Sequence, residues 1–137
     1  MFYISGLYKF KKITYINKKK EILKRFFINN NIKGLIIISK EGINGTIAAK
    51  KKNLDLAVKK IKKVFNFINY DSKSLSKSKF EPFRRSKVKI KKEVVPMGIQ
   101  VLKRTLKGHI EPKNWNNIIS DKNNLVVDAR KPFEYNV

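Results

Sequence analysis

The sequence contains no cysteine and a single histidine, His109. The absence of cysteine excludes thiol nucleophiles, disulfides, cysteine-ligated zinc and iron–sulfur clusters within this chain. One histidine leaves little from which to build a histidine metal cluster or a Ser-His-Asp triad. No carboxylate stands at a defined spacing from His109, so this residue is expected at the surface and not as a general base. No metal site and no cofactor site can be recognised in the sequence.

The sequence also lacks long hydrophobic runs. The longest apolar stretches, around residues 35–38 and 94–102, are far too short to cross a bilayer, and no secretory signal pattern opens the chain. These absences predict a cytoplasmic protein with no membrane partner. Hydrophobic residues still make up 42% of the 137 residues, and aromatic residues 11%. This is enough for the core of one domain, or of one small domain and part of another.

Acidic residues are scarce, because 10 Asp and Glu stand against 33 Lys and Arg, for a net charge of +23. Most of the basic residues are lysines, and an AT-rich coding sequence would enrich Lys, Asn and Ile without selection for binding. The position of the charge is therefore more informative than its total. Residues 109–137 are neutral, so residues 1–108 carry the whole excess. This asymmetry predicts a basic domain over residues 1–107 with a polyanionic partner, and a second segment over residues 108–137.

Strand-like and helix-like patterns alternate along the basic domain. The first expected elements are a strand over Phe2–Phe10, a helix over Lys18–Asn29 and a strand over Gly34–Ser39. A turn over Lys40–Gly45 and a strand from Thr46 follow. The last two elements are a helix N-capped by Asn53, with an apolar stripe from Leu54 to Ile68, and a strand over Val88–Val94. The order β-α-β-β-α-β predicts an α+β, ferredoxin-like domain. Its sheet has helices on one side only, and RNA-binding modules of this topology use the other face as a platform.

The string Glu41-Gly42-Ile43-Asn44-Gly45 has two interpretations. Its backbone N–H groups could converge into a nest for a phosphate or a uracil edge. Alternatively, Asn44-Gly45 is a hairpin turn between the second and third strands, and this interpretation is favoured. Lys40 and Asn44 are retained as candidate RNA contacts, whereas Glu41, Gly42 and Gly45 are assigned structural roles.

A second string, Phe80-Glu81-Pro82-Phe83-Arg84-Arg85, places two adjacent arginines beside aromatic residues. Codon bias explains arginine less readily than lysine, and arginine binds phosphate bidentately and stacks on bases. Arg84 and Arg85 are therefore the leading candidates for RNA contact. Lys87, Lys89 and Lys91 follow at alternate positions of the last expected strand and are candidates on its solvated face. The alternative is that the aromatic residues only pack this loop onto the sheet.

The neutral segment has a pattern of its own. Pro112 is expected to open a short helix with Trp115, Ile118 and Ile119 on its apolar face. Leu125–Val127 is expected to form a strand that closes with Asp128-Ala129-Arg130. A lone helix and strand cannot bury themselves, so this segment either docks on the first domain or opens a second one.

Taken together, these motifs resemble the rhodanese-related tRNA uridine 5-hydroxylases of bacteria. The matching strings occur in the family's order and span nearly the whole chain. They are Ser39–Thr46, Pro82–Arg85, Val88–Val95, Pro112–Trp115 and Leu125–Arg130 followed by Phe133–Tyr135.

The resemblance implies a basic ferredoxin-like domain followed by the incomplete start of a rhodanese-like α/β domain. It also implies oxygen-dependent 5-hydroxylation of the wobble uridine of tRNA, with molecular oxygen as co-substrate. Asp128 and Arg130 would make a structural contribution to the rhodanese segment. The catalytic cysteine of such proteins is expected downstream of Val137. This truncated chain would then supply the tRNA-docking portion and be inactive alone.

Two other functions remain open from the residues. One is a free-standing RNA- or ribosome-binding module, or an inactive remnant, without catalysis. The other is an acylphosphatase-like hydrolase on the same fold. The hydrolase is disfavoured because it requires an arginine in its first phosphate-cradling loop, and Ser5–Tyr8 supplies none.

Overall fold

The structure, a computed structural model, describes residues 1–94 and 110–128. The chain divides into two compact units, Met1–Gly98 and Ile99–Val137, called the first and second unit below. The boundary predicted between residues 107 and 108, and His109 with it, lie outside the described residues. That boundary stays a prediction.

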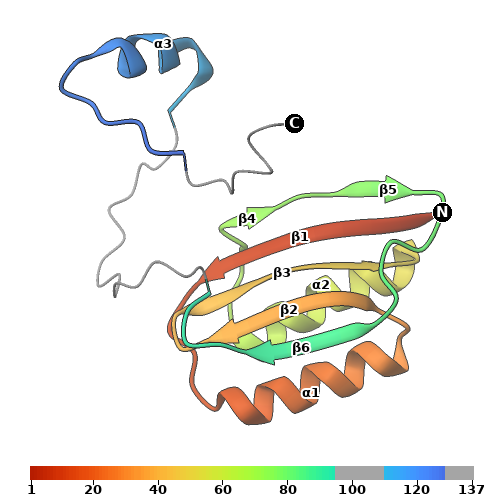
Figure 1. Cartoon of the computed structure of the whole chain (residues 1–137). Helices are drawn as coiled ribbons and strands as arrows, with labels where there is room; N and C mark the ends of the chain where they lie inside the picture. Colours follow the sequence, from red (N-terminus) through yellow and green to blue (C-terminus); the bar gives the residue numbers. More distant parts are fainter. Residues whose placement is uncertain (95–109, 129–137) are drawn as a thin grey trace. The chain divides into compact units, whose positions relative to one another are not determined.

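The first unit contains two helices and six strands among its described residues (Figure 1). In chain order they are β1 (Phe2–Phe10), α1 (Ile16–Asn29), β2 (Lys33–Ser39), β3 (Gly42–Ala49), α2 (Lys51–Phe65), β4 (Ser72–Lys73), β5 (Ser76–Ser78) and β6 (Ser86–Ile90). The first strand has the predicted bounds. The helix α1 and the strand β2 begin slightly earlier than their apolar patterns indicate.

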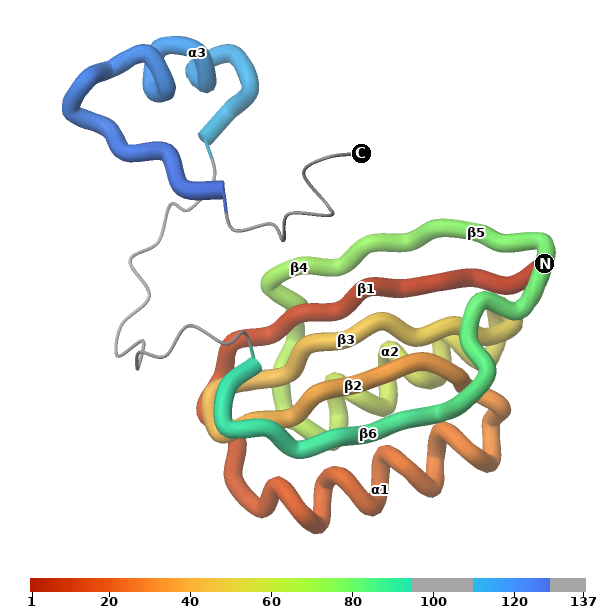
Figure 2. The backbone as a smooth tube through the Cα atoms, in the orientation of Figure 1, coloured from red at the N-terminus to blue at the C-terminus, as the bar shows by residue number. Residues whose placement is uncertain are grey.

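The strands form one mixed sheet in the order β4-β1-β3-β2-β6, with β5 also paired to β1. The strand β3 lies antiparallel between β1 and β2, which makes β1-α1-β2 a split β-α-β unit. On the far side of β2, β6 runs parallel to it, as the Cα trace in Figure 2 also shows. The predicted ferredoxin-type topology is therefore confirmed, with the addition of a parallel edge strand.

The assignment of the last strand in the predicted topology was wrong. On the side of β1 away from β3, the antiparallel partners are the short strands β4 and β5, whereas β6 is an extra strand on the opposite edge of the sheet. The segment Ser72–Ser78 has little apolar alternation because nearly all of its residues are exposed. Period-two patterning requires one buried face, so this edge carried no strand signal.

The predicted turn over Lys40–Gly45 was too long. Only Lys40 and Glu41 make the turn between β2 and β3, and Asn44 and Gly45 lie inside β3. A Cβ atom at Gly42 would lie 2.2 Å from the carbonyl oxygen of Lys9 on the neighbouring strand. Here glycine permits close approach of two backbones, and it does not form the turn.

Both helices pack on the same face of the sheet and enclose the core. The core consists of buried apolar side chains from every major element, namely Leu7, Ile13, Leu23, Phe27, Ile32, Ile36, Ile38, Ile43, Ile47, Ala49, Leu54, Ala57, Val58, Ile61, Phe65 and Val88. The predicted apolar stripe of α2 is confirmed up to Phe65. It was wrong for Ile68, which is 82% exposed because the helix ends before Asn66 adopts a left-handed conformation.

The N-cap predicted for α2 was also wrong. Lys50 occupies the N-cap position, and Asn53 lies within the first turn of the helix. The side-chain Nδ2 of Asn53 donates a hydrogen bond of 2.9 Å to the carbonyl oxygen of Asn30, just after α1 ends. Asn53 therefore joins the two helices and satisfies a carbonyl at the end of α1.

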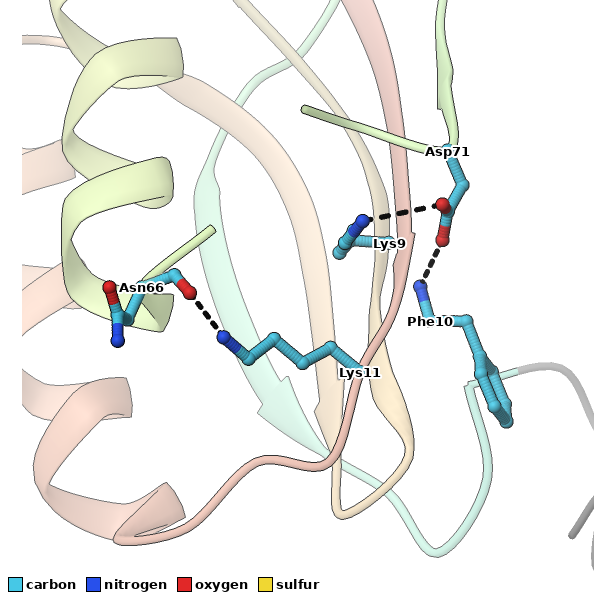
Figure 3. Close-up of polar contacts among 5 residues, drawn as sticks. All are labelled: Lys9, Phe10, Lys11, Asn66 and Asp71. Carbon is cyan, nitrogen blue, oxygen red and sulfur yellow. Dashed lines mark hydrogen bonds and ion pairs between the residues drawn. The ribbon is translucent and has the colours of Figure 1, made fainter. Parts of the chain in front are cut away.

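The end of β1 is fastened to the residues around it by the contacts in Figure 3. Asp71 accepts a hydrogen bond of 2.7 Å from the Phe10 backbone N–H and pairs with Lys9 Nζ at 3.3 Å. Lys11 Nζ donates to the backbone carbonyl of Asn66. These contacts hold the segment between α2 and β4 against β1.

In the second unit, α3 spans Pro112–Ser120 and begins at proline as predicted. The strand predicted at Leu125–Val127 is wrong for this structure, because residues 110–128 contain no strand and Leu125 is 88% exposed. Val126 and Val127 are exposed as well, whereas a stable strand of this apolar composition requires a packed face. Across the described residues of both units, no helix has the length and apolar content that a membrane crossing requires.

Candidate nucleic-acid interface

The face of the sheet opposite the helices, called the open face below, combines aromatic, aliphatic and basic side chains. Side chains alternate between the two faces of a strand, so the neighbours of core residues point to the open face. Leu7, Ile36, Ile43, Ile47 and Val88 are core residues of β1, β2, β3 and β6. By alternation and register, the open face carries Phe2, Ile4, Tyr8, Phe10, Leu35, Ile37, Asn44, Thr46, Lys87 and Lys89.

The strand register arranges these side chains in rows across the sheet. Tyr8 pairs with Asn44, Asn44 with Ile37, and Ile37 with Lys89. One row thus runs from an aromatic ring through an amide and an aliphatic chain to a cation. Neighbouring strands lie about 4.8 Å apart, so these four side chains span a length comparable with one or two nucleotides.

Arg84 and Arg85 lie at the edge of the open face, immediately before β6. With Leu35, Phe83 and Lys87 they line a surface groove of about 470 Å³, called the arginine groove below. Both arginine side chains and Lys87 are exposed, whereas Leu35 and Phe83 are half-buried. The groove therefore has an apolar floor and a cationic rim.

The loop that carries the arginines is anchored to β2. The Arg85 carbonyl accepts a hydrogen bond of 2.9 Å from the backbone N–H of Gly34. Glu81 Oε2 pairs with Lys33 Nζ at 2.5 Å in the same region. Gly34 has a φ of 123°, and a Cβ there would lie 2.2 Å from the Thr46 carbonyl oxygen. These contacts fix the backbone beneath two exposed guanidinium groups, which favours specific binding.

Lys40 and Lys91 lie at the other end of the same strands. Lys91 follows β6, and its backbone N–H donates a hydrogen bond of 3.0 Å to the Ile38 carbonyl. Lys40 lines a second cavity, of about 580 Å³, with the β1–α1 connection and Ile90. The structure thus places Lys87 in the arginine groove, and Asn44 and Lys89 in the next row of the open face. Lys40 and Lys91 lie beyond the opposite ends of β2 and β6.

The string around Glu41 has a structural role. The carboxylate Oε1 of Glu41 accepts a hydrogen bond of 2.8 Å from the Val94 N–H, and Ser39 Oγ accepts one of 3.1 Å from the Glu41 N–H. Gly42 and Gly45 belong to the sheet ladder. Both interpretations made from sequence were wrong, because Gly42–Gly45 is part of a paired strand and forms neither a phosphate nest nor an Asn-Gly turn. Glu41 instead ties the residues after β6 to the β2–β3 turn.

The loop expected for a phosphate-binding hydrolase was misplaced. Ser5–Tyr8 lies inside β1, and the first connection of the fold spans residues 11–15. That connection contains Lys11 and Lys12 but no arginine. The requirement for a loop arginine is therefore still unmet.

The described residues include few groups that are placed for catalysis or metal binding. Within that part of the chain, no three His, Asp or Glu side chains gather to hold a metal ion. Burial raises the pKa of Tyr70, whose hydroxyl donates a hydrogen bond of 2.8 Å to the Val58 carbonyl on the helix side of the sheet.

In the second unit Asp128 is exposed, and Arg130 lies outside the described residues, so their implied structural role stays a prediction.

Sequence reasoning missed Leu35 and Ile37 as surface residues. Gly34–Ser39 is continuously apolar, which is typical of a strand buried on both faces. In the structure Leu35 and Ile37 are only half-buried and point to the open face. The signal that reveals them is the register against Lys87 and Lys89, which requires the position of β6.

The fold is similar to that of two solved acylphosphatases. One, from Bacillus subtilis, is 13% identical with a TM-score of 0.46, over 64% of this chain and 98% of that chain. The other, from Coxiella burnetii, is 7% identical with a TM-score of 0.43, over 64% of this chain and 90% of that chain.

Two curated relatives match nearly the whole chain. A protein named tRNA uridine(34) hydroxylase from Pelagibacter ubique (strain HTCC1062) is 54% identical over 138 residues, covering 100% of this chain and 46% of the relative. A protein of the same name from Ehrlichia ruminantium (strain Welgevonden) is 36% identical, covering 97% of this chain and 49% of the relative. The chain thus spans about half the length of these relatives.

The family resemblance drawn from the motifs is confirmed by these matches, which include all the described residues of the first unit. A family model described as the UPF0176 acylphosphatase-like domain matches residues 2–94, the segment that contains the open face and the arginine groove. The chain therefore belongs to the UPF0176 acylphosphatase-like domain family.

Proposed function

We propose that this chain is the tRNA-docking portion of a tRNA uridine hydroxylase, and that tRNA binds across the open face and the arginine groove. The names of the two relatives support tRNA modification as the process. The reaction proposed for the whole protein is oxygen-dependent 5-hydroxylation of the wobble uridine. The share of this chain is to hold the RNA, since its residues include no cysteine to act as nucleophile.

The single observation that carries the proposal is the arginine groove beside the rows of the open face. Arg84, Arg85 and Lys87 are exposed cations around half-buried apolar side chains. Guanidinium groups bind phosphates bidentately, and exposed aromatic and aliphatic side chains take unstacked bases. A solvated surface with codon-biased lysines would present cations without such an apolar floor.

The test is a comparison of two double variants that each remove two positive charges. R84A with R85A is compared with K59A with K63A, which removes two exposed lysines from α2 on the helix side. We expect the arginine variant to weaken tRNA binding at least about ten-fold more, because a charged contact contributes roughly 1.5–3 kcal/mol when it is directed. The measurement is the dissociation constant over a series of salt concentrations.

Equal losses from the two variants would mean that diffuse charge binds the tRNA and would contradict the proposal. The salt series supplies a second criterion, because each phosphate contact contributes roughly −0.7 to −0.9 to the slope of log K against log salt. We expect the arginine variant to have a shallower slope than the wild-type chain.

A free-standing RNA- or ribosome-binding module is the second candidate. It is favoured because residues 2–94, which the family model matches, contain 26 of the 33 Lys and Arg and the whole groove. Binding of the chain to tRNA and to ribosomes, measured side by side, separates the two. A clear preference for ribosomes would support the module and weigh against tRNA docking.

A further inference from the structure

The arginine groove combines features that a duplex would leave unused. A double helix presents phosphates and groove edges to a protein, and its bases are stacked and paired. Cations alone would suffice to bind such a surface. Here Leu35 and Phe83 lie half-buried between the cations, on the surface and outside the core cluster. An apolar floor of this kind offers contact to a base that is not paired.

We infer that the arginine groove receives one unpaired nucleotide of a single-stranded RNA segment. Its base lies against Phe83 and Leu35, and its flanking phosphates are bound by Arg84, Arg85 and Lys87. This assignment rests on the proposed function and specifies which part of the RNA the groove binds. The groove volume of about 470 Å³ is within the range of roughly 300–1,000 Å³ for small-molecule sites, which suits a single nucleotide.

The strand register places a further row of the open face beside the groove, which extends the argument to neighbouring nucleotides. Lys87 pairs with Leu35, and Lys89 pairs with Ile37 one row further along β2. Positions two residues apart on a strand are separated by about 6.6 Å. A cation beside an aliphatic side chain is thus repeated along the edge. This repeat suits an RNA strand whose backbone follows β6 while its bases turn toward β2 and β3.

The fixed backbone of the loop also favours a shaped site over a diffuse one. The 2.9 Å hydrogen bond from Gly34 to Arg85 and the Lys33–Glu81 pair hold both sides of the loop to β2. Phe83 lies between these two anchors in the sequence. Its ring therefore starts close to the position in which it would meet a base, which lowers the ordering cost of binding.

The experiment uses the full 137-residue chain and two RNA probes with equal numbers of phosphates, an oligouridine single strand and a blunt duplex. The test variant is F83L, which keeps an apolar side chain but removes the ring. The matched control is F80L, because Phe80 lies in the same loop, is 77% exposed and does not line the groove. The thermal midpoint of each variant is measured first, and F83Y serves as a second variant that retains the ring.

We expect F83L to weaken binding of the single strand at least about five-fold, as loss of a base–aromatic stack does. Duplex affinity should change less than about two-fold, and F80L should bind both probes like the wild type. F83Y, which keeps the ring, should retain more single-strand affinity than F83L. Equal losses for both probes in F83L, or the same loss in F80L, would overturn the assignment. Competition by uridine monophosphate at the affinity of the oligonucleotide would also overturn it, because the groove would then be a free-nucleotide site.

Failure of this inference is distinguishable from failure of the proposed function. If R84A with R85A weakens tRNA binding but F83L leaves single-strand affinity unchanged, the groove binds phosphates only and the nucleotide assignment alone is lost. If R84A with R85A also leaves tRNA binding unchanged, the docking surface itself is wrong.

Discussion

Gly42 lies where β3 leaves the turn, and the backbone of β1 passes close to its Cα. Its φ is 156°, and an added Cβ would meet the Lys9 carbonyl oxygen at 2.2 Å. Backbone atoms of a paired strand cannot move aside without breaking the ladder. We therefore expect G42A to lower the free energy of unfolding by about 2–4 kcal/mol, as other strained core changes do.

The control for G42A is G6A on the neighbouring strand. At Gly6 the nearest atom to an added Cβ is the side-chain oxygen of Ser74, at 2.7 Å, which can rotate away. We expect G6A to cost about 1 kcal/mol or less. Urea unfolding of the two variants gives both values, and a loss in G6A as large as that in G42A would contradict the explanation.

Tyr70 illustrates a single side chain whose ionisation opposes folding. Its ring packs edge-to-face on Phe67 with centroids 4.9 Å apart, and its hydroxyl donates to the Val58 carbonyl. Desolvation by burial raises the pKa of Tyr70 above the unfolded value of about 10. The folded state then holds the phenolic proton more tightly, so this contribution to stability is complete below about pH 10 and declines as the pH rises above it.

We expect Y70F to cost about 1 kcal/mol near neutral pH, because the hydrogen bond to Val58 is lost. The difference between wild type and Y70F should shrink above about pH 10, where ionisation of Tyr70 destabilises only the wild type. Chemical denaturation of both proteins between about pH 8 and pH 11 measures this difference. A difference that stays constant over that range would show that Tyr70 does not titrate with folding.

At the scale of elements, success from sequence depended on whether an element has one buried and one exposed side. The strand β1 and the stripe of α2 up to Phe65 could be predicted because their alternation or helical spacing reflects burial on one side. The strands β4 and β5 could not, because they are short exposed edge strands. The start of β3 was missed since Asn44-Gly45 has the local preference of a turn, and tertiary packing placed it in a strand.

One carboxylate adds side-chain contacts to the backbone pairing of β4 with β1. Asp71 accepts the Phe10 N–H at 2.7 Å and pairs with Lys9 Nζ, and its side chain is 15% exposed. Removal of the carboxylate in D71A leaves this N–H without that partner and should cost about 1–3 kcal/mol. Hydrogen exchange of the Phe10 amide should accelerate accordingly, which NMR measures directly.

The control for D71A is D55A. Asp55 pairs with Lys51 at 2.5 Å on the surface of α2, and both side chains are about half exposed. Exposed helix pairs of this spacing contribute roughly 0.3–0.5 kcal/mol. Similar losses of stability in D55A and D71A would mean that Asp71 acts only as a surface charge, and the Phe10 amide would then exchange at the wild-type rate.

At the scale of the whole molecule, the sequence identified the residue types of the candidate site but not their grouping. Arg84, Arg85 and Lys87 are close in the chain and line one groove in the structure, whereas their contact with RNA stays a prediction. Asn44 does not line the groove, and the register of β3 against β2 places it beside Ile37, one row further along the open face. Lys40 is close to Asn44 in sequence and lies outside the groove, because β2 carries it to the opposite end of the sheet.

The residues of the chain favour tRNA binding, but they do not favour catalysis of the hydroxylation for which its relatives are named. The excess charge and the arginine groove favour tRNA binding, whereas no cysteine is present to form a covalent or redox intermediate. We therefore expect the purified 137-residue chain to bind tRNA with strongly salt-dependent affinity and to produce no 5-hydroxyuridine. Nucleoside mass spectrometry of the tRNA after incubation in air measures the product.

The positive control is the Pelagibacter ubique tRNA uridine(34) hydroxylase, which is about twice as long and 54% identical over the shared region. Product from this relative and none from the 137-residue chain would assign the chemistry to residues that the chain does not contain. Product from both would show that the groups needed for hydroxylation lie within these residues. The docking role would then be incomplete, and the search for reactive groups would move to the open face itself.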